Sequence, residues 1–120
     1  MFCFTLLFSL MMSEGYPASV KDQISFGALM AKKGNWKEAI FRWEKALKHD
    51  PENYRLHNNI AVAYEALGKY EKADKAYQLA LKYGKNNKRI QENYNLFRKL
   101  YDPQKSKEKT TDQESQGPTR

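Results

Sequence analysis

The sequence predicts an all-α protein, a solenoid of two stacked helix-turn-helix hairpins that one further helix closes at the C-terminal end. The first observation behind this prediction is an internal repeat, in which residues 34–39 (GNWKEA) return as residues 68–73 (GKYEKA). Gly34 begins the first copy and Gly68 begins the second, and we call the offset between these two residues the repeat period. The second observation is an apolar stripe after the second copy, with the spacing of one helical face. This stripe consists of Ile90, Tyr94, Phe97 and Tyr101.

The first repeat unit is predicted over residues 20–53 and the second over residues 54–87. Small residues recur where the two helices of a hairpin would touch, and large residues recur around them. Gly34 and Gly68 occupy the predicted turn of each hairpin, where a positive φ favours glycine. The Asp50-Pro51 step ends the first hairpin, because a residue before proline avoids the helical region. The predicted core residues are Phe26, Gly27, Gly34, Trp36, Ala39, Trp43, Ala46, Pro51, Ile60, Ala61, Tyr64, Gly68, Tyr70, Ala73, Tyr77 and Ala80.

These residues resemble the tetratricopeptide repeat, a helix-turn-helix unit with the pattern W-x2-L-G-x2-Y, followed by A, an aromatic residue, A and P. Counted from Val20 and from Tyr54, both units match the pattern, and the resemblance extends over residues 20–101. Two features depart from it. Gln23 and His57 stand where the pattern has Trp, and the second unit lacks the closing Pro, so we expect Gly84 to end that helix in a left-handed conformation. The resemblance implies a helical stack that binds a protein or peptide.

The C-terminal part of the chain is predicted to contain a helix and then a tail. Residues 88–101 form the predicted capping helix, because no second helix follows and a terminal unit needs one polar face. Asp102-Pro103 ends this helix. Residues 102–120 hold no aromatic residue and no aliphatic side chain larger than proline. Burial cannot offset the ordering entropy of such a segment, which predicts a disordered polar tail.

The formal net charge of +7 falls on the predicted helices, because residues 1–19 hold only Glu14 and the charges of the tail balance. Part of this charge gathers near the capping helix. This pattern fits a solvated basic surface, and it also fits a docking face for an acidic partner, whose association would depend on salt. The basic residues near the cap are Lys85, Lys88, Arg89, Arg98 and Lys99.

Residues 2–12 form an apolar run. The run is too short to span a bilayer as a helix, which takes about 20 residues, and it suits the apolar core of a signal peptide. Ser13 and Gly15 are small residues that fit cleavage before Tyr16. The weak point of this interpretation is that no Lys or Arg precedes the run. Cys3 is the only cysteine, so a cleaved chain would form no disulfide and no Cys-based metal site.

We therefore expect a cleaved export signal over residues 1–15, a linker over residues 16–19, and a periplasmic or secreted protein of the bacterial envelope. Two alternatives stay open for the leader: an uncleaved anchor at a membrane surface, and an extra helix buried against the domain. Without cleavage the protein would be membrane-associated or cytoplasmic. Membrane contact is expected only through residues 1–12.

The sequence shows no catalytic or metal-binding constellation. His49 and His57 lack the spacing of a metal-ligating pair on one helix, and no cysteine accompanies them. The chain has no glycine-rich phosphate loop, and no motif supplies a base to Ser19 or Ser25. We therefore expect no enzyme activity, no cofactor, no metal and no small-molecule substrate. His57 is expected to serve in packing or in a hydrogen bond.

The resemblance places the partner groove along the first helix of each unit, at its second, fifth, sixth, ninth and twelfth places. In both units and in the capping helix, the second place is basic and the ninth is apolar. An apolar strip with a cationic edge suits a peptide that carries apolar anchors and nearby Asp or Glu. The candidate groove residues are Lys21, Arg55 and Arg89 at the second place, Ala28, Val62 and Leu96 at the ninth, and Ile24, Asn58, Asn59 and Glu65 at the others.

Some members of the family hold a terminal carboxylate with a set of Lys, Asn and Arg side chains. Here Asn59 and Arg89 match that set by place, whereas Ile24, Ala28 and Asn93 replace the Lys, Asn and Arg that it needs. We therefore predict no such clamp.

The predicted function is a non-catalytic adaptor that binds a protein segment. One alternative is a scaffold tethered to a membrane by the leader. The other is a basic, cytoplasmic accessory protein of nucleic acid. The second alternative is disfavoured, because most aromatic residues fall at core places and no nucleic-acid motif is present.

Overall fold

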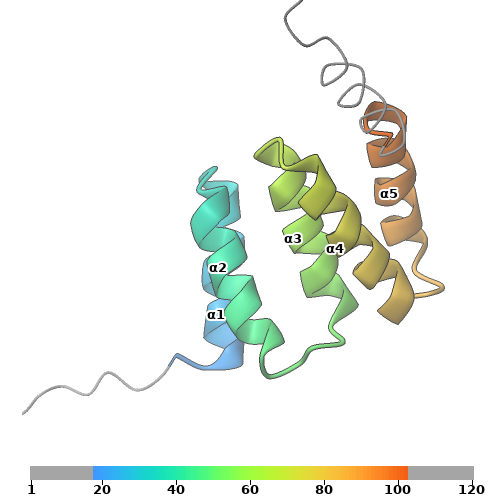
Figure 1. Ribbon diagram of the computed structural model, residues 1–120. Helices are drawn as coiled ribbons and strands as arrows, with labels where there is room; N and C mark the ends of the chain where they lie inside the picture. The colour runs from blue at the N-terminus through green and yellow to red at the C-terminus, as the bar shows by residue number, and fades with distance from the viewer. Residues whose placement is uncertain (1–17, 103–120) are drawn as a thin grey trace, which may run out of the picture.

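The computed structural model describes residues 18–102. Within this range the chain forms five helices and no strand, which confirms the predicted all-α class. In Figure 1, α1 and α2 lie together, α3 and α4 lie together, and α5 follows at the end of the row. The predicted leader (1–15) and the tail beyond residue 102 lie outside the described residues. The helices are α1 Val20–Lys32, α2 Trp36–Leu47, α3 Tyr54–Ala66, α4 Tyr70–Tyr83 and α5 Lys88–Leu100.

Three helices begin at equal intervals because the same kind of residue caps each of them. Ser19, Asn53 and Asn87 precede α1, α3 and α5, and each stands one repeat period after the one before. Each of these side chains accepts a 3.2 Å hydrogen bond from the backbone N–H three residues further on. Such a cap stabilises a helix by about 1 kcal/mol. The period of the sequence is therefore also the period of the helix starts.

The turn inside each hairpin uses a glycine in the left-handed region, as predicted. Gly34 and Gly68 have φ angles of 76° and 69°. In both turns the next residue donates its N–H to a carbonyl on the last turn of the preceding helix, at 2.9 Å, from Asn35 in the first and from Lys69 in the second. This bond satisfies a carbonyl that the end of the helix would leave without a partner.

Trp43 sets how closely the two helices of the first hairpin approach. Its side chain is 3% exposed, and its indole Nε1–H donates to the Ile24 carbonyl at 3.2 Å. A Cβ atom at Gly27 would lie 2.5 Å from that same Nε1. Only glycine leaves room for the indole ring at this point of α1.

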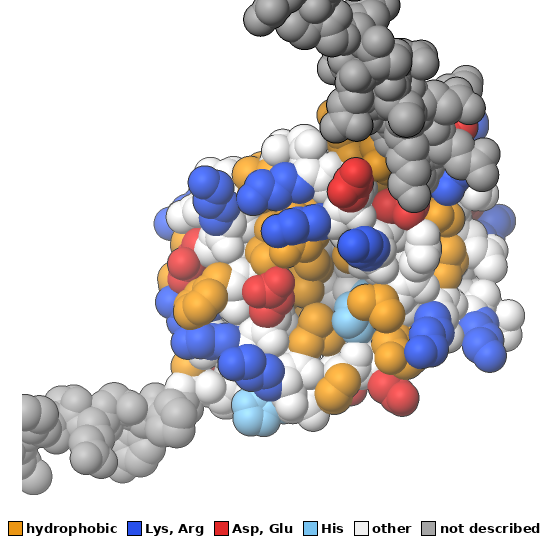
Figure 2. All heavy atoms as spheres, viewed as in Figure 1, with side chains coloured by type: hydrophobic (Ala, Val, Ile, Leu, Met, Phe, Trp, Pro, Cys, Tyr) orange, Lys and Arg blue, Asp and Glu red, His pale blue; other side chains and the backbone are white. Residues whose placement is uncertain are grey.

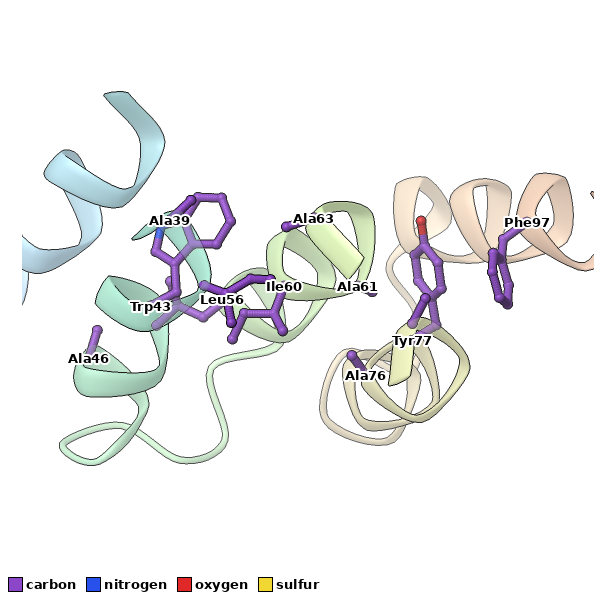
Figure 3. Close-up of a cluster of buried hydrophobic side chains, with 12 residues drawn as sticks. Ala39, Trp43, Ala46, Leu56, Ile60, Ala61, Ala63, Ala76, Tyr77 and Phe97 are labelled. Carbon is purple, nitrogen blue, oxygen red and sulfur yellow. The ribbon is translucent and has the colours of Figure 1, made fainter. Parts of the chain in front are cut away.

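The buried cluster continues from one hairpin to the next. Figure 3 shows it passing from Trp43 on α2 through Ile60 on α3 to Tyr77 on α4 and Phe97 on α5. The alanines predicted at the contacts between helices are completely buried, which lets neighbouring backbones approach. These alanines are Ala39, Ala46, Ala61, Ala73 and Ala80.

Tyr77 occupies in the second hairpin the place that Trp43 has in the first. It is 1% exposed, and its hydroxyl donates to Oε2 of Glu65 on α3 at 2.9 Å. Burial, and next the bond to this carboxylate, raise the pKa of the Tyr77 phenol far above its usual value. The phenol stays protonated and keeps α3 and α4 joined. Between the hairpins, Tyr64 on α3 donates to Oε1 of Glu44 on α2 at 3.3 Å.

The face of α5 that was predicted from the apolar stripe packs against α4. Ile90 and Phe97 are 3% and 1% exposed, and the Phe97 ring centroid lies 5.2 Å from that of Tyr77. The Tyr94 hydroxyl donates to Oδ1 of the buried Asp74 on α4 at 2.9 Å. Aromatic packing and one buried polar bond thus attach the last helix.

The outer side of α5 is polar. Asn95 and Arg98 are exposed there, at the places where α1 has Gly27 and Met30. Those two places of α1 receive the second helix of its hairpin. In α5 they face no further helix within the described residues, so α5 closes this end of the stack.

The prediction for Gly84 is wrong. Its φ is −113°, which lies outside the left-handed region. The glycine is needed for space, because a Cβ atom here would lie 2.8 Å from Cγ of Tyr54 and 3.0 Å from the Ala80 carbonyl oxygen. The sequence thus identified Gly84 as the residue at the end of this helix, but the reason for a glycine there is steric and not a left-handed conformation.

Five of the predicted core residues are exposed: Gly34, Pro51 and Gly68 at the turns, and the two large side chains of Phe26 and Tyr70. Phe26 is 41% exposed, whereas Ile60 at the same place of α3 is 5% exposed. The difference arises because α2 packs against α3, and no helix within the described residues packs against the corresponding side of α1. Tyr70 is 45% exposed at the edge of the α4–α5 contact, where one face of its ring stacks on Tyr101 with the ring centroids 5.5 Å apart.

The first prediction concerns Trp43. Trp43→Ala removes a buried indole and its hydrogen bond, and we expect it to lower the free energy of unfolding by about 3–5 kcal/mol. Urea unfolding followed by circular dichroism measures this loss. Phe41→Ala on the same helix is the control, because Phe41 is 47% exposed and its loss costs below about 1 kcal/mol. Equal losses in the two variants would contradict the role given to Trp43.

The second prediction concerns the contact between Gly27 and Trp43. Gly27→Ala forces a Cβ atom against the indole and lowers the free energy of unfolding by about 1–3 kcal/mol. In a Trp43→Leu background the indole is gone, and alanine is the better helix former by about 1 kcal/mol, so the same change becomes neutral or stabilising. Urea unfolding of the four proteins gives both values. A cost that is the same in both backgrounds would show that the indole is not the cause.

Candidate functional site

A cleft of about 430 Å³ opens between α3 and α5. It lies on the side of the stack formed by the first helices of successive units, where the groove is predicted. Most of its lining is polar or basic. The lining residues are Tyr54, Arg55, Asn58 and Asn59 of α3 with Asn87, Arg89 and Ile90 at the start of α5.

Two arginines reach this cleft because the repeat places them alike. Arg55 and Arg89 are the second residues of α3 and α5, each directly after a capped helix start, and both are exposed. The Arg55 guanidinium lies 5.7 Å from the Tyr54 ring centroid. Free N–H groups give a helix start a partial positive charge, which adds to that of the arginines. The cleft edge is therefore suited to an anionic group.

The cleft also has an amide wall. Asn58 is 9% exposed, and its Oδ1 accepts a 3.1 Å hydrogen bond from Nδ2 of Asn93 on α5. This bond joins the two helices that line the cleft. Because the Asn58 oxygen is engaged, its remaining hydrogen-bonding capacity is mainly that of a donor. Asn59, the next residue, is half-buried.

A second cleft of about 470 Å³ adjoins the first and shares Tyr54 and Asn87 with it. It adds Lys82 and Lys85 to the cationic lining. No Asp or Glu is among the lining residues of either cleft. Figure 2 shows that Lys and Arg side chains also spread over the face turned towards the viewer, with hydrophobic side chains between them. Basic side chains are thus common on the protein surface. The two adjoining clefts bring four of them, Arg55, Arg89, Lys82 and Lys85, to one concave part of it.

The structure brings together part of the predicted groove. Arg55, Asn58, Asn59 and Arg89 line one cleft. The remaining predicted groove residues do not line it. Of these, Lys21, Ala28, Val62 and Leu96 are exposed.

Two predicted groove residues are used inside the domain. Ile24 packs against the buried cluster, and its carbonyl accepts the Trp43 indole N–H. Glu65 accepts the Tyr77 hydroxyl. Both residues are half-buried, so each keeps only part of its surface for a partner.

Sequence reasoning did not assign Tyr54, Asn87 and Ile90 to the groove. Asn87 and Ile90 lie where α4 leads into α5. Tyr54, at the start of α3, lies beside them because it packs against Gly84 just before that corner. The sequence signal for this corner was the lack of the closing proline in the second unit, together with Gly84. At Gly84 the chain passes close to the start of α3.

His57 is engaged inside the domain, in a hydrogen bond and in ring packing. His57 is 8% exposed, and its Nε2 lies 2.8 Å from the Pro51 carbonyl oxygen, which can only accept, so Nε2 carries the proton. Its ring stacks on that of Tyr83, with the ring centroids 5.6 Å apart.

Among residues 18–102, no three His, Cys, Asp or Glu side chains lie close enough together to hold a metal ion. None of α1 to α5 is long and apolar enough to cross a membrane.

Comparison with known proteins agrees with this architecture. No protein of curated function matches the chain. A family model described as tetratricopeptide repeat matches residues 30–92, from within α1 to within α5. The match covers more than half of the chain, and it includes both glycine turns and the corner that shapes the two clefts. The chain belongs to the tetratricopeptide repeat family.

Proposed function

We propose that this protein is a non-catalytic interaction module that binds an acidic peptide segment with apolar anchors between α3 and α5. Tetratricopeptide repeats generally mediate protein–protein interaction, and the family is typically non-catalytic. The proposal adds to that general role a particular cleft and the kind of segment that would fill it.

The observation that carries the proposal is the pairing of Arg55 and Arg89 at one cleft whose lining contains no acidic side chain. Two guanidinium groups in a concave site attract carboxylates more strongly than the same charges on an open surface. They also favour planar, two-point hydrogen bonds with a carboxylate. The Asn58 and Asn59 amides beside them suit the backbone of an extended peptide.

Apolar anchors are supported by the ninth-place residues of the same helices. Val62 on α3 and Leu96 on α5 are 36% and 60% exposed. A peptide that places an acidic side chain between the arginines can bury apolar side chains on these residues. In this division of roles, the apolar contacts supply affinity, and the charges supply register and association rate.

The compartment in which the module works depends on residues 1–15, which lie outside the described residues. Export with cleavage before Tyr16 stays a prediction, as does tethering by an uncleaved leader.

The third prediction tests the cleft. Peptides selected from a random display library on the intact protein should carry Asp or Glu with apolar neighbours. Arg55→Glu combined with Arg89→Glu should weaken a selected peptide by at least about tenfold, because two attractions become repulsions. Fluorescence anisotropy gives the dissociation constants, and circular dichroism checks that the variant stays folded. Affinity for the unmodified protein should fall as salt is raised.

Lys37→Glu combined with Lys75→Glu is the matched control. It changes the net charge equally, at exposed places of α2 and α4 that do not line the cleft. If both double variants weaken binding alike, overall charge and not the cleft is responsible. If an oligonucleotide binds more tightly than any selected peptide, the nucleic-acid alternative replaces this proposal.

A further inference from the structure

The first helix carries an exposed stripe on a side that no other described helix covers. The stripe runs along α1 to its C-cap residue and consists of Asp22, Phe26, Leu29 and Lys33. Phe26 and Leu29, in its middle, are 41% and 45% exposed and line a shallow cleft of about 390 Å³. The Arg42 guanidinium lies 4.6 Å from the Phe26 ring centroid and forms one edge of this surface. We call the four residues the end stripe.

The same places of the other first helices form the contact with the helix before them. One repeat period further on, where α2 meets α3, the stripe is Leu56, Ile60, Ala63 and Leu67. A second repeat period further on, where α4 meets α5, the stripe is Ile90, Tyr94, Phe97 and Tyr101. Its spacing is that of a coiled-coil seam, at which two helices pack nearly in line. The end stripe is therefore at a place where this fold packs one helix on another.

In α1 the two ends of the stripe are charged, with opposite signs. Asp22 stands where α3 has the buried Leu56. Lys33 stands where α3 has Leu67. Neither charge forms an ion pair within residues 18–102. A helix that fits α3 is apolar along the whole stripe, whereas a helix that fits α1 supplies a cation at one end and an anion at the other.

The end stripe is complementary to itself when two copies of α1 lie antiparallel. Asp22 lies as far before Phe26 as Lys33 lies after Leu29. A two-fold axis through the middle of the stripe therefore places Phe26 of one copy opposite Leu29 of the other. The same axis places Asp22 of each copy opposite Lys33 of the other. A two-fold dimer uses one surface patch twice in this way.

We propose that this protein forms a two-fold dimer in which the end stripes of two copies pack antiparallel. Burial of the apolar middle supplies the affinity, and the two pairs of Asp22 with Lys33 set the direction. The Ser19 hydroxyl and backbone N–H donate to Oδ2 of Asp22 at 2.7 Å and 3.1 Å, which holds the carboxylate in place. These two bonds lower the pKa of Asp22, so its charge is present at neutral pH.

The size of the contact indicates a weak, reversible dimer. α1 has 13 residues, and only one side of it takes part. Stable interfaces bury about 1,200–2,000 Å² in total, and one helix from each copy buries less. We therefore expect a dissociation constant of the order of tens of micromolar, which rises as salt screens the two charge pairs.

Two separate charge reversals test the pairing. In a dimer of Asp22→Lys, lysine faces Lys33, and in a dimer of Lys33→Asp, aspartate faces Asp22. Each variant should therefore associate with itself about tenfold more weakly than the unmodified chain. An equal mixture of the two variants should recover the association, because every facing pair is again opposite in charge. Sedimentation equilibrium of the full chain at low salt measures the constants, and circular dichroism checks that each variant is folded.

Lys99→Asp is the matched control, because it makes the same charge change at an exposed place near the end of α5. It should dimerise like the unmodified chain, and its mixture with Asp22→Lys should associate less well than the mixture of Lys33→Asp with Asp22→Lys. If the latter mixture associates no better than its separate components, the proposal is overturned. Weakened helix capping in Asp22→Lys cannot imitate the recovery, because mixing does not restore the cap.

A full chain that stays monomeric well above the expected dissociation constant also overturns the proposal. Phe26→Ser then distinguishes the other occupants of the surface. A large loss of stability in the monomer would indicate that another part of the same chain covers the end stripe. An unchanged stability would leave the surface to a different protein.

Discussion

The close contact between Gly27 and Trp43 sets the packing from which the first hairpin is built. The indole fills the space that a missing side chain leaves on α1, and its N–H binds the Ile24 carbonyl on the same helix. That position brings α1 and α2 together and leaves Ile40 and Leu47 of α2 to pack in the cluster shared with α3. In the second hairpin, Tyr77 has this place and adds a hydroxyl bond to Glu65. The stack repeats one steric arrangement with two different aromatic residues.

Sequence reasoning predicted the fold well because the repeat encodes it twice. The fully buried alanines, the two left-handed glycines and the stripe of α5 each appear where the period places them. The errors fall where a residue depends on what lies beside the repeat. Phe26 is exposed because no helix among residues 18–102 packs against that side of α1, and the need for glycine at position 84 comes from Tyr54, which is distant in sequence. The repeat period predicts the contacts within one unit, but it does not predict the contacts that a residue makes with the part of the chain beside that unit.

The candidate site was predicted less completely, for the same reason. The second place of each first helix was recognisable as basic, and Arg55 and Arg89 do meet at one cleft. How much of a groove residue is left for a partner depends on contacts within the domain: Ile24 packs partly against the buried cluster, and Glu65 accepts the Tyr77 hydroxyl. The wall of the cleft depends on the Asn58–Asn93 bond between helices of different units. A sequence pattern gives no direct sign of such a bond.

The attachment of α5 has a consequence for how binding and folding influence each other. This helix supplies one wall of the cleft, and it is held by α4 through Tyr94 and Phe97 and by α3 through Asn93. A terminal helix is the part of a stack that opens at the lowest free energy. Opening of α5 would separate the Arg89 side of the cleft from the Arg55 side, so a ligand that contacts both can bind only the closed state. Its affinity is then reduced by the fraction of open molecules, and its binding in turn protects the backbone of α5 from hydrogen exchange.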